Sequence, residues 1–516
     1  MKIDYGMEVV LMKAQSASKE FFSGLLLAML LITPAYSAQG AATQPEARTV
    51  RYFQSVKQQA PLLWAFLKEM PKGGDLHNHL SGAIYAESMI NWAAEDGLCV
   101  DKRTFFLSAP PCDEVRANVV TVLRDAQLYR QVVDAWSMRN QAISGQSGHD
   151  HFFDTFDKFD LAGERRVGEM LAEVSSRAAA GRVNYLELML TPAFPEIVRA
   201  APVAGWHNDL AAMRQAIKQP ALAEAVRKAA DTLTLAETKR REIQRCETLA
   251  ADPGCAVTVR YQYQVLRGLP AEIVFAQMLL GFELASIDPR VVGLNLVMPE
   301  DAFVPMRDFS LHMRMLDYLH QSYPRVHIAL HAGELTPGLV PPEGLRFHIR
   351  DSIVIGHAQR IGHGVAVMQE DEAMALLRKM AHDKVMVEIC LTSNEGILGV
   401  QGARHPLSVY LKQGVPVALA TDDEGVSRSE MTHEYLKAVQ EQNVDYRQLK
   451  AMARNSLQYS FVEGASLWKD FERRRRVREC SGDSLSANCQ GYLARHTRAR
   501  LQWALEEAFT KFERKY

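Results

Sequence analysis

The hydrophobic residues of this chain form two alternating patterns over most of its length. Short runs rich in apolar and β-branched residues, typical of buried strands, are separated by stretches with apolar residues at helical spacing. The runs lie at 72–77, 183–190, 256–266, 291–297, 326–330, 360–362, 385–391 and 415–420. Helical patterns follow the later runs at 270–286, 308–323, 347–358, 370–382, 405–413 and 429–442.

Eight strand–helix units in this order predict an α/β fold, a (β/α)8 TIM-type barrel of parallel strands. The connections after the first two runs are much longer than the others, so we expect helical insertions at about 83–180 and 198–250. The barrel domain is expected over 71–465. A lead-in and helix at 39–70 would precede it, and a charged helical extension at 466–516 would follow it.

The N-terminus has the three-part pattern of a secretory signal peptide. Residues 21–32 form a short apolar run, with Lys13 and Lys19 before it and small residues at 35–38 after it. The run is shorter than the ~20 apolar residues of a spanning helix. We therefore expect cleavage near residue 38 and a periplasmic or secreted protein. Met12 is an alternative start, because acidic residues precede it.

The overall charge gives no argument for a polyanionic partner. The 516 residues carry a formal net charge of −2, so neither nucleic acid nor an anionic membrane is indicated. Two basic runs, at 239–241 and 473–476, are interpreted as solvated helix faces rather than as nucleic-acid contacts.

The cysteines agree with export. Six of the seven lie in near pairs, which an oxidising compartment would allow to form local disulfides. The alternative is that these are ordinary free thiols. The expected pairs are Cys99 with Cys112, Cys246 with Cys255, and Cys480 with Cys489; Cys390, in an apolar run, is expected to be a buried strand residue.

Ionisable residues stand at the carboxyl ends of several predicted strands. His77 and His79 end the first run, and side chains two apart on a strand share a face. Alone, such a pair is as well explained by solvent-facing or hydrogen-bonded histidines. The carboxyl ends of all eight strands meet at one mouth of a barrel, however. His331 and Glu334, then His363, then Asp422 and Asp423 would converge there with the first pair, which predicts a metal site.

The sequence resembles the adenosine deaminase family of metal-dependent amidohydrolases over roughly residues 60–465. The residues that carry the resemblance are the segment 70–74 with the histidines after it, Glu388–Asn394, and the run from His405 to Asp423. These motifs are most similar to the secreted adenosine deaminase 2, or growth-factor, branch.

The resemblance implies a (β/α)8 barrel that holds one Zn²⁺ per chain. The metal ligands would be His77, His79, His331 and Asp422. Two catalytic residues are also implied: Glu334 as the acid that protonates purine N1, and His363 as the group that orients and deprotonates the metal-bound water and stabilises developing charge. Asp423 would bind N7 of the purine ring.

Several positions depart from the family pattern. Relatives often carry a ribose-binding carboxylate just after the paired histidines, where Leu80 and Ser81 stand here. Met298 occupies a position that is usually a glycine whose backbone contacts the purine, and Glu424 replaces a common proline. Glu187 on the second strand is a candidate replacement ribose contact; otherwise it is a barrel-lining acid.

We therefore expect an exported zinc hydrolase that acts on the C–N bond of a cyclic amidine, converting adenosine or 2′-deoxyadenosine to the inosine product and ammonia. The altered ribose contacts leave open a deaminase of free adenine or another aminopurine. A non-enzymatic nucleoside-binding or signalling protein is disfavoured, because none of the seven expected site residues is missing. The partner is expected to be a small purine nucleoside, with no nucleic acid and no membrane after signal cleavage. The resemblance alone suggests a homodimer.

Overall fold

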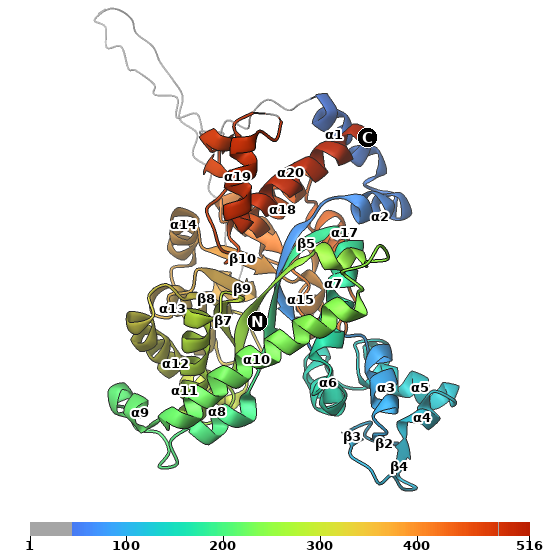
Figure 1. Ribbon diagram of the computed structural model, residues 1–516, viewed down its shortest axis with the longest axis vertical. Coiled ribbons are helices and arrows are strands. Elements are labelled where there is room, and N and C mark those ends of the chain that lie inside the picture. The colour runs from blue at the N-terminus through green and yellow to red at the C-terminus, as the bar shows by residue number, and fades with distance from the viewer. Residues whose placement is uncertain (1–43, 483) are drawn as a thin grey trace, which may run out of the picture. The chain divides into compact units, whose positions relative to one another are not determined.

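Eight parallel strands form a single sheet in the computed structural model, which describes residues 44–482 and 484–516 (Figure 1). Each strand pairs with the next one in the order β1, β5, β6, β7, β8, β9, β10, β11. Their bounds are β1 (Gly73–His79), β5 (Val183–Leu190), β6 (Thr258–Leu266), β7 (Val291–Val297), β8 (His327–Ala332), β9 (Arg360–His363), β10 (Met386–Ile389) and β11 (Val417–Leu419). All eight predicted strands are confirmed to within a few residues.

The sheet closes where the segment after β11 meets β1. Asn78 and Asp422 form a parallel bridge there. The His79 N–H donates to the Asp422 carbonyl (3.0 Å), and the Asp422 N–H donates to the His77 carbonyl (2.8 Å). The predicted TIM-type barrel is confirmed, and its seam runs through expected site residues.

Helices follow the later strands in the predicted alternation (Figure 1). The helix α12 begins five residues before the predicted start; Pro305 lies in its first turn, where proline is tolerated. The helices are α11 (Ala271–Ile287), α12 (Phe303–Ser322), α13 (His348–Val354), α14 (Ala373–Asp383), α15 (Leu391–Leu398), α16 (Leu407–Gln413), α17 (Met431–Gln442) and α18 (Tyr446–Gln458).

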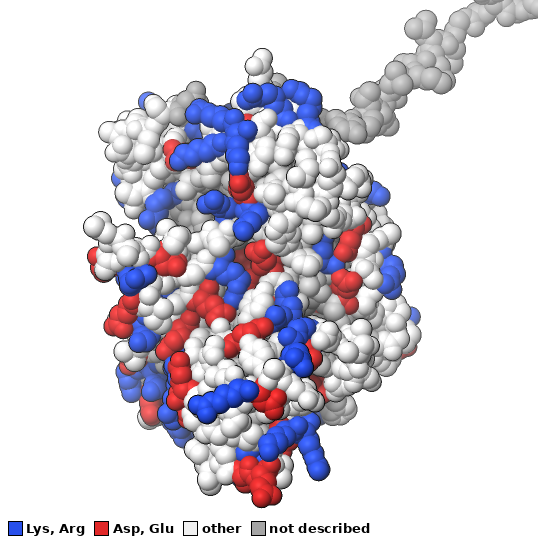
Figure 2. Space-filling model, turned by 90° about the vertical axis from the view of Figure 1, so that its right-hand side faces the viewer, with Lys and Arg blue, Asp and Glu red and all other residues white. Residues whose placement is uncertain are grey.

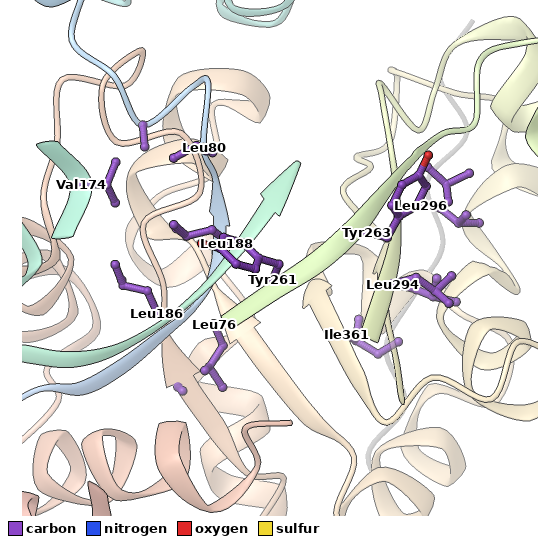
Figure 3. Packing of buried hydrophobic residues seen from close by; sticks show 14 of the residues in the cluster. Leu76, Leu80, Val174, Leu186, Leu188, Tyr261, Tyr263, Leu294, Leu296 and Ile361 are labelled. Atoms are coloured by element: carbon purple, nitrogen blue, oxygen red, sulfur yellow. The ribbon is translucent and has the colours of Figure 1, made fainter. Parts of the chain in front are cut away.

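The barrel strands alternate between apolar side chains that pack into the hydrophobic core and polar side chains inside the barrel. Figure 3 shows the apolar set, including Leu186 and Leu188 of β5 and Tyr261 and Tyr263 of β6, all buried. A residue between each pair has the opposite orientation, since successive side chains on a strand point to opposite faces. The polar interior set comprises His77, Glu187, Gln262, Asn295, Arg360 and Glu388, all fully buried.

The guanidinium of Arg360 forms ion pairs with two glutamates of this interior. Arg360 Nη2 donates to Glu187 Oε2 and its Nε donates to Glu388 Oε1, both at 2.6 Å. The guanidinium carbon also lies 3.7 Å from the ring centroid of Phe461. Because these charges have partners, the barrel tolerates them in its buried interior.

The first insertion differs from its prediction. It contains α3 (Ala86–Glu95), α4 (Val119–Val122), α5 (Ala126–Ala135), α6 (Gly148–Gly163) and α7 (Val167–Ala180), as expected. It also contains an antiparallel sheet of β2 (Cys99–Asp101), β3 (Leu107–Ser108) and β4 (Arg116–Asn118), which a purely helical interpretation missed. Strands of two or three residues are too short to show a period-2 pattern. The second insertion is helical, with α8 (Phe194–Ala200), α9 (Leu210–Ala216) and α10 (Gln219–Ile243).

The three predicted disulfides are confirmed. Each joins cysteines 9 or 13 positions apart. Cys390 is a buried free thiol, as expected, but it lies between β10 and α15 rather than on a strand. The disulfide Cys99–Cys112 links β2 of the small sheet, on which Cys99 lies, to the loop that contains Cys112.

The segments outside the barrel are α1 (Gln44–Val56), α2 (Ala60–Glu69), α19 (Ala487–Arg495) and α20 (Thr497–Lys515), with a hairpin of β12 (Trp468–Asp470) and β13 (Arg475–Arg476). The expected signal peptide lies outside the described residues. Within the described ranges, no helix is long and apolar enough to cross a membrane.

The two basic runs are not both helix faces, as had been expected. Residues 473–476 lie in the turn and second strand of the hairpin. In the other run, Arg240 is buried and donates to the carbonyls of Gly254 (2.7 Å) and Val257 (3.0 Å), so it binds the chain itself. Figure 2 shows both signs of charge interspersed over most of one face.

The Arg360 network predicts a large stability loss when one charge is removed. Glu187→Gln should lower the free energy of unfolding by about 3–5 kcal/mol, because it leaves part of a buried guanidinium uncompensated. Lys379→Ala, which breaks an exposed pair with Asp383, should cost less than about 0.5 kcal/mol. Urea denaturation of both variants measures this, and equal losses would contradict the network's importance.

Candidate metal centre and active site

Four side chains from separate parts of the barrel bring donor atoms to one point. His77 Nε2 and His79 Nε2 lie 3.0 Å and 3.1 Å from His331 Nε2. Asp422 Oδ1 lies 3.3 Å from both His77 Nε2 and His79 Nε2. Two of these residues end β1, one ends β8, and the fourth follows β11 across the seam.

The hydrogen bonds on the far side of each imidazole fix its tautomer. Every Nδ1 faces an oxygen acceptor, so it carries the proton of a neutral ring and leaves a lone pair on Nε2. The pairs are His77 with Glu388 Oε2 (2.7 Å), His79 with Gln264 Oε1 (2.9 Å) and His331 with Asn295 Oδ1 (2.9 Å). The Asn295 oxygen is unambiguous, because it also accepts the backbone N–H of His331 (3.0 Å).

Three lone pairs and a carboxylate oxygen at this separation repel one another unless a cation lies among them. Asp422 Oδ1 is buried and has no hydrogen-bond partner among the described residues. Donors held about 2.0–2.1 Å from a tetrahedral ion would lie roughly 3.3 Å apart, close to the separations found here. The residues therefore fit a divalent metal ion bound by three imidazoles and one carboxylate.

The charges around His77 support the same conclusion. Burial alone would lower the pKa of His77, but Asp422 and Glu388 on its two sides outweigh burial and raise that pKa to about 10. The negative charge around this imidazole therefore favours a cation at the centre of the cluster.

The backbone is strained at the site. Asp422, His363 and Met298 have φ values of 59°, 65° and 90°, in the left-handed region that ordinary residues avoid. Such conformations persist where surrounding contacts determine them. At Asp422 these contacts are the seam hydrogen bonds and Ser393 Oγ, which donates to Oδ2 (2.7 Å).

Glu334 is held beside the cluster by its own backbone. Glu300 accepts the N–H of Gly333 (3.1 Å) and of Glu334 (2.8 Å), and also binds His348 Nδ1 (2.6 Å). This fixes the turn after β8. Burial, with Asp422 and Glu300 nearby, raises the pKa of Glu334 well above its usual value, which favours the protonated form of its carboxyl.

His363 and Asp423 complete the cluster predicted from the sequence. His363 Nε2 and Asp423 Oδ1 are buried and have no hydrogen-bond partners in the described part of the chain. Burial raises the pKa of Asp423 to about 8. A Cβ at Gly82 would lie 1.6 Å from Asp423 Oδ1, so the glycine after the paired histidines is required for this close approach.

These groups open into a cavity of ≈ 470 Å³. Phe152, Phe153 and Phe156 of α6 line it, together with Asp157 and Met298. The first insertion therefore supplies an aromatic wall. The sequence predicted helical structure in this insertion but no contribution of it to the site.

Two sequence-level candidates for substrate contact have different outcomes. Met298 lines the cavity and has a φ of 90°, in the region of backbone conformation that favours glycine. Glu187, the candidate ribose contact, does not line this cavity, which favours the alternative of a barrel-lining acid. Its carboxylate accepts hydrogen bonds from Tyr185 (2.8 Å), Gln262 (3.1 Å), Arg360 (2.6 Å) and the Phe461 N–H (2.7 Å), which satisfy it inside the barrel.

The residues behind the metal cluster were missed from the sequence. Gln264 and Asn295 are polar residues between apolar neighbours on β6 and β7, a signal that could have marked them as interior. Glu388 and Asn394 belong to a motif that carries the family resemblance but indicates no role for either residue. Their partners in the fold could not be inferred without the barrel.

Fold and site together define a metal-binding (β/α)8-barrel protein. The family model for adenosine deaminase matches residues 121–469, which is more than half of the chain. The chain belongs to the adenosine deaminase family. The match begins after β1, so the two histidines of that strand lie outside it.

Individual relatives are more distant. Adenosine deaminases of Escherichia coli strains SE11 and HS are 33% identical over 154 residues, which is 30% of this chain and 41% of each relative. The alignment thus spans less than half the length of these curated relatives.

Solved structures support the fold alone. The apo N6-methyl-AMP deaminase from Arabidopsis thaliana has a TM-score of 0.53 at 19% identity, covering 87% of this chain and 99% of that chain. An amidohydrolase from Burkhoderia ambifaria with bound Zn has a TM-score of 0.50 at 15% identity, covering 86% and 94%.

The tautomers predict which histidines bind metal. His79→Ala should weaken divalent metal binding by at least about 100-fold, and Gln264→Ala, which removes only the Nδ1 acceptor, by about 10–100-fold. His382→Gln, at a side chain that is 88% exposed, should change nothing. Competition of the purified proteins with a chelating dye measures the affinities, and unchanged binding by His79→Ala would contradict the ligand set.

Proposed function

We propose that this protein is a zinc-dependent deaminase that hydrolyses adenosine and 2′-deoxyadenosine to inosine or deoxyinosine and ammonia. The observation that carries the proposal is the convergence of a metal cluster, the buried Glu334 and unpartnered polar atoms of His363 and Asp423 on one cavity. Family membership and the zinc in a structural relative support it.

The residues fit the needs of this reaction. Zinc would supply Lewis acidity that lowers the pKa of water toward 7. The protonated carboxyl of Glu334 donates to purine N1 and makes C6 electrophilic. Asp423 in its protonated form donates to N7, and the phenylalanines of α6 provide an apolar wall for a flat ring.

Protons and atoms balance over one cycle. Water contributes its hydroxyl to C6 and a proton to Glu334, whose previous proton has passed to N1. The proton on the new C6 oxygen then moves to N6, the C6–N6 bond breaks, and ammonia leaves. The product keeps the N1 proton and gains a C6 carbonyl.

The cavity favours an uncharged substrate over a nucleotide. None of the described residues that line it is lysine or arginine, whereas Asp157 and Asp160 of α6 face into it. Burial, with Asp157 and Glu164 nearby, raises the pKa of Asp160 to about 6. Carboxylates at this position would repel a phosphate.

Free adenine or another aminopurine is the second candidate. The observation that favours it is the absence of a carboxylate just after the paired histidines, where Leu80 is buried and Ser81 lines the cavity.

We further propose that the chain is exported and belongs near the adenosine deaminase 2 branch. Three disulfides outside the barrel strands are consistent with an oxidising compartment. The motifs at 70–79, 388–394 and 405–423 support the branch.

Glu334→Gln should fold and keep its metal but lose at least about 100-fold in kcat on adenosine, because an amide cannot protonate N1. Glu343→Gln, an exposed glutamate nearby, is the matched control and should retain full activity. Ammonia release and metal content are measured together. Retained turnover in Glu334→Gln would refute its role as the acid.

A substrate panel on the zinc-loaded protein separates the candidates. We expect kcat/KM for adenosine to exceed that for adenine and for AMP by at least about 10-fold, since a phosphate would meet Asp157 and Asp160. A preference for adenine would establish the second candidate, and a preference for AMP would contradict both.

A further inference from the structure

His363 differs from the three imidazoles of the metal cluster in what its far side faces. Its Nδ1 lies 3.0 Å from Asn394 Nδ2, an amide N–H donor, whereas His77, His79 and His331 each present Nδ1 to an oxygen. The atoms of His363, His77, His331 and Asp422 lie close enough to be mistaken for one ligand set. The hydrogen bonds separate them.

A chain of hydrogen bonds that begins at the backbone determines the direction of each donor. The N–H of Leu407 can only donate, and it points to His405 Nδ1 (3.1 Å). The proton of a neutral His405 is therefore on Nε2, which donates to Asn394 Oδ1 (3.1 Å). Asn394 Nδ2 then donates to His363 Nδ1, and the proton of His363 is on Nε2.

The reverse assignment fails at one position. Turning over the Asn394 amide would require a lone pair on His405 Nε2 and hence a proton on its Nδ1. That proton would face the Leu407 N–H, placing two donors against each other. A doubly protonated His405 would still place a donor against the Leu407 N–H, and burial disfavours that form because it lowers the pKa of His405 to about 4.

Asn394 is held in place by the start of α15. Glu434 accepts the N–H groups of Leu391 (2.7 Å) and Thr392 (3.2 Å) and so caps this helix. Both Asn394 and His405 are buried, with exposures of 0% and 1%. The connection therefore lies inside the protein, away from its surface.

The environment of His363 Nε2 makes this proton consequential. The atom is buried, has no partner in the described chain, and lies 3.9 Å from Asp422 Oδ2 at the edge of the metal cluster.

We propose that Asn394 and His405 are positioning residues that keep the proton of His363 on Nε2, so that His363 donates a hydrogen bond to the oxygen that attacks C6 and does not act as the base. This rests on the proposed deamination. The proton of water goes to Glu334 in the balance given above, so the step needs no base at His363. A proton on Nε2 also excludes this nitrogen as a metal ligand.

The tautomer can be read directly. In a long-range ¹H–¹⁵N spectrum of zinc-loaded protein labelled at histidine nitrogens, His363 should show a protonated Nε2 and an unprotonated Nδ1. His363→Gln assigns its signals by their loss. Asn394→Asp replaces the donor with a second acceptor, so the proton should move to Nδ1. A wild-type proton on Nδ1 would overturn the proposal.

Kinetics test the consequence. Asn394→Asp should lose about 100-fold in kcat on adenosine, the cost of removing one donor to a developing oxyanion, with KM changed less than about threefold. His405→Phe should lose on the order of tenfold, and His405→Gln, whose amide can still donate to Asn394, should recover most of that loss. Unchanged kcat in Asn394→Asp would refute the positioning role.

Two controls keep the outcomes distinct. Thermal melting and zinc content show whether each variant is folded and loaded, and His382→Gln at the exposed surface should match the wild type. If the wild-type protein deaminates no aminopurine, the proposed function fails, while the ring-nitrogen spectrum still decides where His363 carries its proton.

Discussion

The closure of the barrel is the constraint on which the site depends. The bridge between Asn78 and Asp422 joins the first strand to the segment after the last one. Its hydrogen bonds use the backbone of His77, His79 and Asp422, and their side chains form three of the four donors of the metal cluster. The hydrogen bonds that close the sheet therefore also bring these ligands together, although 343 positions separate Asp422 from His79.

The polar interior links stability to chemistry. Glu388 accepts from Arg360 with one oxygen and from His77 with the other. The first contact balances a buried cation, and the second sets the tautomer of a metal ligand. In many proteins a buried ion pair can be replaced by apolar residues with little loss of stability. Here the same replacement would also remove the hydrogen-bond partner of the His77 imidazole.

The same type of side chain performs different tasks at this site because its hydrogen-bond partners differ. Imidazoles backed by Glu388, Gln264 and Asn295 present lone pairs, and the imidazole backed by Asn394 presents a proton. Similarly, Glu334 has a raised pKa because burial and nearby carboxylates oppose its ionisation, whereas Glu388 has a lowered pKa because Arg360 and His77 outweigh burial.

The sequence by itself determined the strand–helix order, the local disulfides and the seven residues at strand ends, because these depend on periodicity, short loops and the meeting of parallel strand ends at one mouth. It could not show the small sheet around Cys99, because strands of two or three residues are too short to have a pattern. Nor could it show that the carboxylate oxygens of Glu187 accept hydrogen bonds inside the barrel. Only the tertiary structure decided the partners of each imidazole and the place of α6 at the cavity. A tautomer depends on which atom lies opposite a ring nitrogen, and those atoms come from distant segments.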